Sequence, residues 1–294
     1  MNTISALIRR NVKLFFKDKG MFFTSLITPV ILLVLYGAFL GDVYRDTFVQ
    51  NIPVTLPEEL LNGLVGGQLI SSILAVSCVT VSFCSNFLMV QDKANGTIKD
   101  LRISPVKPWV LSLSYYVATL AATLLICLVA AGVCLAYVAA IGWYMSAADV
   151  ALLLLDVVLL VLFGTALSSI VNFFLSTQGQ ISAVGTVVSS CYGFISGAYM
   201  PISQFGEGLQ RVIMFLPGTY GTGLMRNHAM GGAIRELESL HVPETAITGL
   251  KDAMDCNLYF FDDQVSISTM YAVICIATLV LVAGYVLLNK LKKR

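Results

Sequence analysis

The chain has 294 residues, of which 57% are hydrophobic and only 12% are charged. Soluble domains carry about 25% charged residues, and the mean hydropathy here is +0.83, so the composition excludes a soluble domain and predicts an integral membrane protein. The net charge of +1 indicates no partner class, and the seven cysteines, six of them in apolar runs, are not spaced like a disulfide framework.

An amphipathic helix is the first predicted element, within residues 1–20. Apolar residues fall on one broad helical face, whereas Arg9, Arg10, Lys13 and Lys17 fall on the other. Such a separation is typical of a helix that lies in the headgroup plane of a membrane. The alternative is a positively charged flank that only sets the orientation of the first span.

Six apolar segments follow, each near or above the roughly 20 helical residues that a bilayer core requires. They cover residues 21–40, 64–90, 110–141, 150–175, 181–199 and 265–288. The first is longer than the apolar region of a signal peptide, which has about 7–15 residues, so we expect it to remain in the protein. The sequence thus predicts an all-α membrane protein with six transmembrane helices.

Basic residues are distributed unevenly between the connecting segments. The segment through Lys19 holds five, residues 91–109 hold four and the C-terminal tail holds four, whereas the predicted external segments hold the remaining five. Because cytoplasmic loops are enriched in Lys and Arg, we predict that both termini are cytoplasmic. The expected location is the plasma membrane.

The polar loop at residues 91–109 separates the second and third predicted spans. Asn95-Gly96 is a turn signal. Residues 97–103 can then form a short helix, which Pro105 ends because a proline disfavours helical geometry at the residue before it. This loop is therefore predicted to present a short basic helix to a cytoplasmic partner.

Residues 200–226 resemble neither a span nor an ordinary loop. Their apolar stretches are interrupted by Pro201, Pro217 and five glycines. Such a segment predicts an external re-entrant helical hairpin, which a membrane tolerates where protein or a water-filled cavity shields the backbone. The alternative is a helical loop wholly outside the membrane. Residues 227–264 are polar and of mixed charge, and they predict a small external helical insertion.

Asp156 is the one acidic residue well inside a predicted span. An ionisable side chain there indicates a functional site, but a structural role beside a backbone group, a hydroxyl or another subunit explains it equally well. No Gly-x-x-x-x-Gly-Lys-Ser/Thr motif occurs, and the isolated His228 and His241 do not indicate a catalytic or metal site. We expect no catalytic residues, ATP site or metal in this chain.

Three motifs resemble those of the permease subunits of ABC exporters, which move drugs, polysaccharides and related substrates. The basic amphipathic helix is similar to the interface helix of that family. The segment from Asp92 to Thr97, followed by residues 101–106, resembles its cytoplasmic coupling loop. Residues 196–201, followed by residues 216–220, resemble the pattern of its external re-entrant hairpin.

The resemblance implies that residues 1–294 form one transmembrane permease domain, which works as a homodimer or heterodimer in membrane lipid. It implies a separate ATP-binding cassette subunit that binds ATP and Mg, and no nucleic acid. The implied function is ATP-driven export of an amphipathic, drug-like, peptide or lipid-linked substrate. Contacts to the ATPase are implied for Arg9, Arg10, Lys13, Asp92, Lys93, Gly96, Thr97, Lys99, Arg102 and Pro105, and an external gate for Pro201, Pro217 and Tyr220.

Other functions fit parts of the same sequence. One is an ion-coupled secondary transporter with Asp156 as its coupling site, although such transporters often have interrupted helices in both halves and here an interrupted segment occurs once. A membrane-embedded enzyme is another, but no paired acids or nucleophile arrangement is found. The remaining alternative is a non-transporting membrane anchor or sensor.

Overall fold

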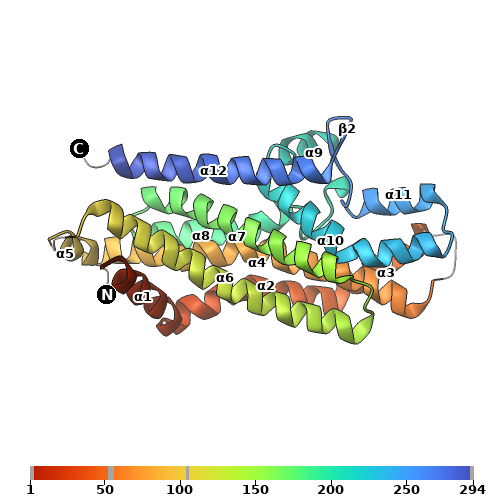
Figure 1. The fold of residues 1–294 in the computed structure, drawn as a ribbon, viewed down its shortest axis with the longest axis horizontal. Coiled ribbons are helices and arrows are strands. Elements are labelled where there is room, and N and C mark those ends of the chain that lie inside the picture. Colours follow the sequence, from red (N-terminus) through yellow and green to blue (C-terminus); the bar gives the residue numbers. More distant parts are fainter. Residues whose placement is uncertain (1–2, 52–55, 104–105, 292–294) are drawn as a thin grey trace.

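The computed structural model describes residues 3–51, 56–103 and 106–291. They form a bundle of helices, most of which follow one long axis (Figure 1). An all-α membrane fold is thereby confirmed, with one small β-hairpin added. The elements are α1 (Thr3–Lys17), α2 (Lys19–Leu35), the π-helix η1 (Tyr36–Leu40), α3 (Gly41–Asn51), α4 (Glu58–Ala94), α5 (Thr97–Ile103), α6 (Pro108–Ile141), α7 (Ala147–Phe174), α8 (Gln178–Ile195), the 3-10 helix η2 (Ile202–Gln204), α9 (Glu207–Ile213), α10 (Pro217–Ser239), α11 (Glu244–Ala253), β1 (Leu258–Phe260), β2 (Asp263–Val265) and α12 (Ile267–Leu291).

Four of the described helices are long and apolar enough to cross a membrane by themselves: α4, α6, α7 and α12. The bent pair α1 and α2 adds a fifth candidate. The predicted fifth span is present as α8, but its 18 residues include six Gln, Ser and Thr side chains, which lower its hydropathy. Length and composition therefore support four or five spans, and the count of six stays a prediction.

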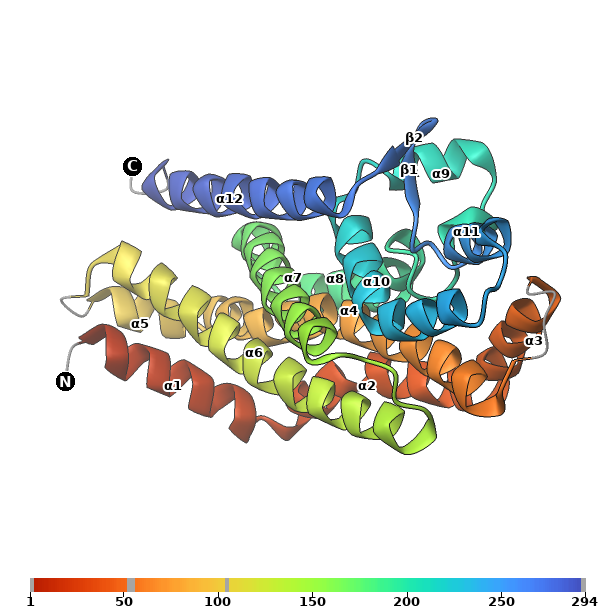
Figure 2. The ribbon, with the colours of Figure 1, turned by 45° about the vertical axis from the view of Figure 1, so that its right-hand side comes forward.

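The predicted N-terminal amphipathic helix is α1. Leu7 and Phe15 are buried, whereas Arg9 and Lys13 are exposed. α1 lies along α6 and meets α2 at an angle of 70° (Figure 2). Asp18 stands at this bend, where its carboxylate accepts a hydrogen bond of 3.0 Å from the Met21 amide and so caps the start of α2.

Two predicted external boundaries differ from the structure. α2 continues through η1 into α3, so the first half of the segment predicted as a polar loop is helical. α4 begins at Glu58 instead of residue 64, because Glu58 and Glu59 in its first turn are favourable at the positive end of the helix dipole. At the junction of η1 and α3, Gly41 has no Cβ to clash with the Tyr36 carbonyl, from which a Cβ would lie only 2.8 Å away.

The predicted boundary between hairpin and insertion at residues 226 and 227 falls inside α10, which is one continuous helix. Its glycines do not break it. They allow close contacts with neighbouring helices, as at Gly221, whose missing Cβ would lie 2.6 Å from Leu160 of α7. Residues 227–239 therefore belong to the helical core, and the external insertion is reduced to α11 and the hairpin of β1 and β2. A re-entrant position for α10 stays a prediction.

α4 is the central helix, and it packs against α2, α6, α7, α8 and α10. Small residues let the backbones approach closely, which is how membrane helices gain packing energy. Gly164 of α7 lies against the Cys78 carbonyl, and Gly67 lies against the Ala229 carbonyl of α10. Asn86 donates hydrogen bonds of 3.1 and 3.0 Å to Ser168 and Ser169 of α7. This packing positions both ends of the bundle.

The close contact between α10 and the connection from α6 to α7 gives a direct test of the packing. A Cβ at Gly232 would lie 2.0 Å from the Tyr144 carbonyl, whereas a Cβ at Gly132 of α6 would meet nothing within 4 Å. We expect Gly232→Ala to destabilise the detergent-solubilised protein by about 1–3 kcal/mol. The control Gly132→Ala should leave the thermal unfolding midpoint unchanged or raise it. Equal midpoints for the two variants would contradict the packing of α10.

Candidate functional site

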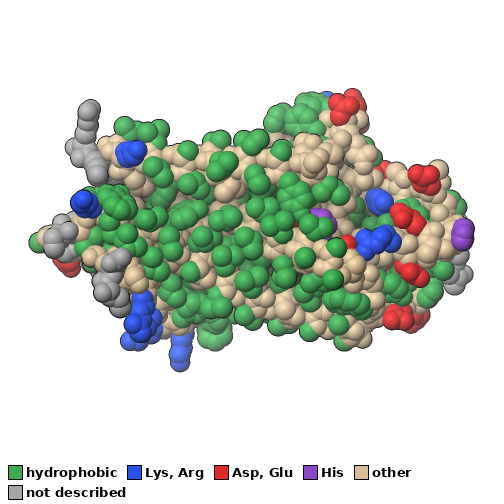
Figure 3. Space-filling view, viewed as in Figure 1, with side chains coloured by type: hydrophobic (Ala, Val, Ile, Leu, Met, Phe, Trp, Pro, Cys, Tyr) green, Lys and Arg blue, Asp and Glu red, His purple; other side chains and the backbone are tan. Residues whose placement is uncertain are grey.

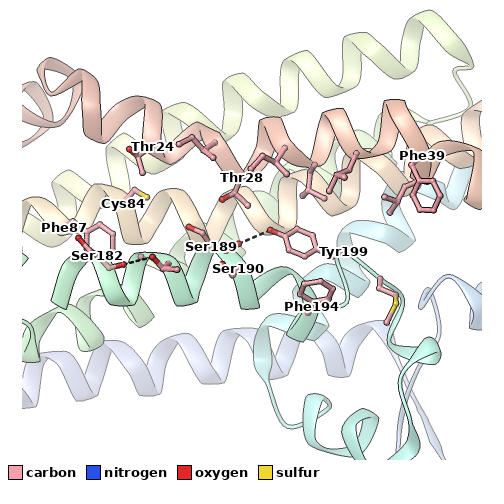
Figure 4. A pocket seen from close by; sticks show the side chains of 18 of the residues that line it. Thr24, Thr28, Phe39, Cys84, Phe87, Ser182, Ser189, Ser190, Phe194 and Tyr199 are labelled. Atoms are coloured by element: carbon pink, nitrogen blue, oxygen red, sulfur yellow. Dashed lines mark hydrogen bonds between the residues drawn. The ribbon is translucent and has the colours of Figure 1, made fainter. Parts of the chain in front are cut away.

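A groove with a volume of about 1330 Å³ runs between α2 and α8, with residues of α4 at its floor (Figure 4). Ile27 and Ile31 of α2 line one side, and Ser189 and Phe194 of α8 line the other. The groove extends from Asp18 at the bend of α1 and α2 to the loop that follows α8. Its wall is mostly apolar, with hydroxyl groups between the apolar side chains.

One of the three predicted gate residues lines this groove. Pro201 lies at its outer end, together with Tyr199 and Met200. Tyr199 donates a hydrogen bond of 3.1 Å to the Ser189 carbonyl of α8, which fixes its ring over the groove. Tyr199 and Met200 belong to the motif of residues 196–201, but the sequence-based gate prediction did not include them.

The other two predicted gate residues, Pro217 and Tyr220, lie away from the groove lining and contribute to the fold of α10. Pro217 is the first residue of α10, a position that suits proline because it needs no amide donor. Tyr220 is buried and donates a hydrogen bond of 2.7 Å to the Met214 carbonyl. Neither is among the residues that line the groove. In this conformation they support the fold around the outer end and do not face the groove.

A buried ion pair holds the outer end of the groove. Arg226 of α10 donates hydrogen bonds to Asp255, at 3.2 Å, and to the Gly197 carbonyl, at 2.8 Å. Asp255 also accepts a bond of 2.6 Å from the Ile202 amide. Burial raises the pKa of the Asp255 carboxyl, and the nearby Arg226 opposes this effect. Gly197 adopts a left-handed φ of 72°, which permits the sharp turn at this point.

The structure contains the turn and the short helix that the sequence predicts for residues 91–109. Gly96 has a φ of 81°, so it ends α4 in the left-handed conformation that glycine accepts readily. α5 follows directly, and Thr97 is its first residue. Lys99 on α5 is exposed, as are Arg9 and Lys13 on α1. The side chain of Arg102 and all of Pro105 lie outside the described parts of the chain.

Arg10 and Asp92, predicted to contact a partner, contact each other. Arg10 of α1 donates a hydrogen bond of 2.9 Å to Asp92 at the end of α4, and Tyr115 of α6 donates to the same carboxylate oxygen. Asp92 is buried. A carboxylate shared by three helices couples their positions, so Asp92 joins α1, α4 and α6 within the subunit.

Lys93 also makes its contacts within the subunit. Its ammonium group donates to the carbonyls of Asn172, Phe173 and Leu175, at 2.8 to 2.9 Å. These carbonyls form the C-terminal end of α7, where a positive charge is favourable because it faces the negative end of the helix dipole. Lys93 therefore connects the end of α4 to the end of α7. No local sequence signal marks this contact, which spans about 80 residues.

Asp156 forms a three-helix contact in the middle of the bundle. One carboxylate oxygen lies 2.6 Å from Nδ1 of His228 on α10, and the other accepts a hydrogen bond of 2.8 Å from Tyr271 on α12. Asp156 is buried. The sequence placed His228 in the external insertion, so this partner was missed. Among the described residues, no group of three or more His, Cys, Asp or Glu side chains is arranged to hold a metal ion.

Comparison with known proteins identifies the family to which this chain belongs. Residues 2–229 match the model of the family described as ABC-2 type transporter. A search among curated proteins gave no match. The matched segment contains the groove helices α2 and α8 as well as α1 and α5. Because it includes 228 of the 294 residues, the chain belongs to the ABC-2 type transporter family, as a transmembrane component of an ABC transporter.

Proposed function

We propose that this chain is the permease subunit of an ATP-driven exporter in the plasma membrane. A separate ATP-binding cassette subunit binds ATP and Mg and docks beneath α1 and α5. Six spans place both termini in the cytoplasm, with α8 as the fifth span and the bent pair of α1 and α2 contributing the first. The observation that carries the proposal is the family match over both the groove and the cytoplasmic elements.

The distribution of charge supports this orientation. On the face shown in Figure 3, Lys and Arg side chains predominate at the end that holds α5, whereas Asp and Glu side chains gather at the opposite end, where some Lys and Arg side chains also lie. A broad hydrophobic region lies between the two ends. The start of α1 and the end of α12 lie at the α5 end as well (Figure 1). Positive charge is retained on the cytoplasmic side of a membrane protein, so the α5 end faces the ATPase.

A second permease subunit completes the transport pathway. α2 exposes large apolar side chains, among them Phe23, Val30 and Val34, each of which is more than half exposed. α8 exposes Val187 and Phe194 beside the same groove. A partner permease, identical or related, that faces α2 and α8 would close the open groove into a pathway between the two subunits. The apolar and hydroxyl lining fits an amphipathic substrate.

The contacts at the cytoplasmic end explain how ATP hydrolysis moves the subunit. Force on α1 reaches α4 and α6 through Arg10, Asp92 and Tyr115. Lys93 extends the connection from α4 to α7. These helices therefore move together when the ATPase binds one conformation more tightly than another, because a ligand shifts a conformational equilibrium by its differential affinity. The residues available for the ATPase itself are the exposed Arg9, Lys13 and Lys99.

The docking role of these basic side chains is tested by charge reversal. We expect Lys13→Glu combined with Lys99→Glu to weaken co-purification of the ATPase by about tenfold or more, since like charges at an interface cost several kcal/mol and about 1.4 kcal/mol is tenfold. Membrane insertion should be unchanged, because both side chains are exposed.

Lys251→Glu is the matched control for this experiment. It makes the charge change of one of the two substitutions, on α11 at the opposite end of the bundle. ATPase recovery with this variant should equal that of the unmodified protein. If the double variant retains full ATPase binding and full substrate-stimulated hydrolysis, α1 and α5 are not the docking elements.

The role of Asp156 follows from its contacts. Both carboxylate oxygens have a protein partner, which supports a structural connection between α7, α10 and α12 over an ion-coupling site. We expect Asp156→Asn to lower the thermal unfolding midpoint, since a mismatched buried polar group costs about 1–3 kcal/mol. ATP-driven transport per folded molecule should be retained. Loss of transport at unchanged stability would instead favour a secondary transporter coupled through Asp156.

A further inference from the structure

We propose that the groove between α2 and α8 selects amphipathic cations over amphipathic anions. The inference assigns a substrate class to the exporter proposed above and rests on that function. Three features of the groove carry it: the hydrogen-bonding state of its hydroxyl groups, the sign of its one charge, and its aromatic rings.

Three hydroxyl groups that line the groove, on Thr24, Ser182 and Thr186, donate their hydrogens to carbonyls of their own helices. Thr24 donates its hydrogen to the Gly20 carbonyl at 2.7 Å, and Thr186 donates to the Ser182 carbonyl at 2.9 Å. Ser182 in turn donates to the carbonyl of Gln178 at 3.3 Å. A hydroxyl has one hydrogen and two lone pairs, so a hydroxyl that donates to its own helix offers only oxygen lone pairs to a ligand. Such oxygens attract N–H groups and cations and repel anions.

The charged side chain of the groove, like the hydroxyl oxygens, favours a cationic ligand. Among the described residues that line it, Asp18 is the one Asp, Glu, Lys, Arg or His residue. Lys17 and Lys19 are its neighbours in the chain, but neither lines the groove. An amphipathic anion entering from the cytoplasmic end would therefore meet a carboxylate and no cation of the groove, whereas an amphipathic cation would gain a favourable pair.

Aromatic rings supply the apolar surface that suits a cation. Phe87 of α4, Phe194 of α8 and Tyr199 lie along the groove, and Phe39 of η1 lies at its outer part (Figure 4). The face of an aromatic ring attracts a cation by about 0.5–2 kcal/mol, depending on desolvation. The rings can therefore hold both the apolar body and the charged group of the same ligand.

The outer end of the molecule continues this electrostatic preference. Residues 41–63, 142–149 and 200–264 contain thirteen acidic residues and five basic ones. An excess of one sign of charge raises the local concentration of ions of the opposite sign. A cation that leaves the groove past Tyr199 and Pro201 thus moves toward an acidic surface, and an anion moves against it.

A binding experiment on the full chain tests the preference without the ATPase. The protein is placed in nanodiscs of zwitterionic phosphatidylcholine, and a photoreactive alkyltrimethylammonium probe labels it. Dodecyltrimethylammonium, dodecyl maltoside and dodecanoate compete for labelling, so that the competitors share one alkyl chain and differ in charge. We expect labelled peptides from α2 and α8, and a half-maximal concentration at least about tenfold lower for the cation than for the anion.

The variants separate charge from structure. Asp18→Asn removes the charge and keeps the cap of α2, because Asn is as good an N-cap as Asp. It should raise the half-maximal concentration of the cation about fivefold, the factor that corresponds to about 1 kcal/mol, and leave that of the maltoside unchanged. Thr186→Val should raise the cation value by a smaller factor. Asp100→Asn, which removes an equal charge from an exposed residue of α5 outside the groove, should change neither value.

Each outcome decides the proposal. Equal or stronger competition by dodecanoate, or labelling outside α2 and α8, would overturn it, as would an unchanged cation value in Asp18→Asn. Absence of labelling by the cationic probe would overturn it as well. Failure of the exporter role has a different signature, because no ATPase would then co-purify while the nanodisc result still stands. Where the ATPase is recovered, the cation should also stimulate its hydrolysis at a lower concentration than dodecanoate does.

Discussion

Close packing around α4 is the constraint on which the rest of the structure depends. The most apolar stretch of α4 is wholly buried. Neighbouring helices approach α4 at glycine and serine positions, as at Gly67 and Gly164. Between apolar helices in lipid there is little hydrophobic driving force, so van der Waals contact and interhelical hydrogen bonds must supply the stability. A central helix of this kind fixes the relative positions of α2, α7 and α10. The positions of the groove, of the loop that follows α8 and of α1 and α5 therefore depend on how those helices pack.

Polar contacts are concentrated at three levels of the bundle. Asp92 joins α1, α4 and α6 at the end that holds α5, Asp156 joins α7, α10 and α12 within the bundle, and Asp255 holds the turn after α8. Each is a carboxylate with two or more partners, which is the condition under which a buried charge is tolerated. Removing one partner of such a group is costly. The three acids therefore restrict how the helices can slide relative to each other, and they favour motion of connected helices as units.

Hydropathy and turn signals in the sequence predicted much of this architecture. The long apolar helices, the turn at Gly96 and the short helix after it follow from composition and local geometry alone. The same signals failed for α10, because glycine in a helix lined by protein permits close contact instead of ending the helix. They also could not identify the partners of Lys93 or Asp156, which lie 72 to 115 residues away in the chain and leave no local pattern. Of the gate residues, only Pro201 was both selected and placed at the groove.

Asp18 has two structural roles. Its carboxylate starts α2 at the bend after α1, and the same carboxylate lies at the mouth of the groove. Substitutions at this position that preserve the fold are therefore largely restricted to Asn, Ser and Thr, each of which can begin a helix. All of these are neutral, so evolutionary drift here can erase the negative charge but cannot readily invert it. A homologue that handles the opposite class of cargo would have to acquire its positive group elsewhere along α2 or α8.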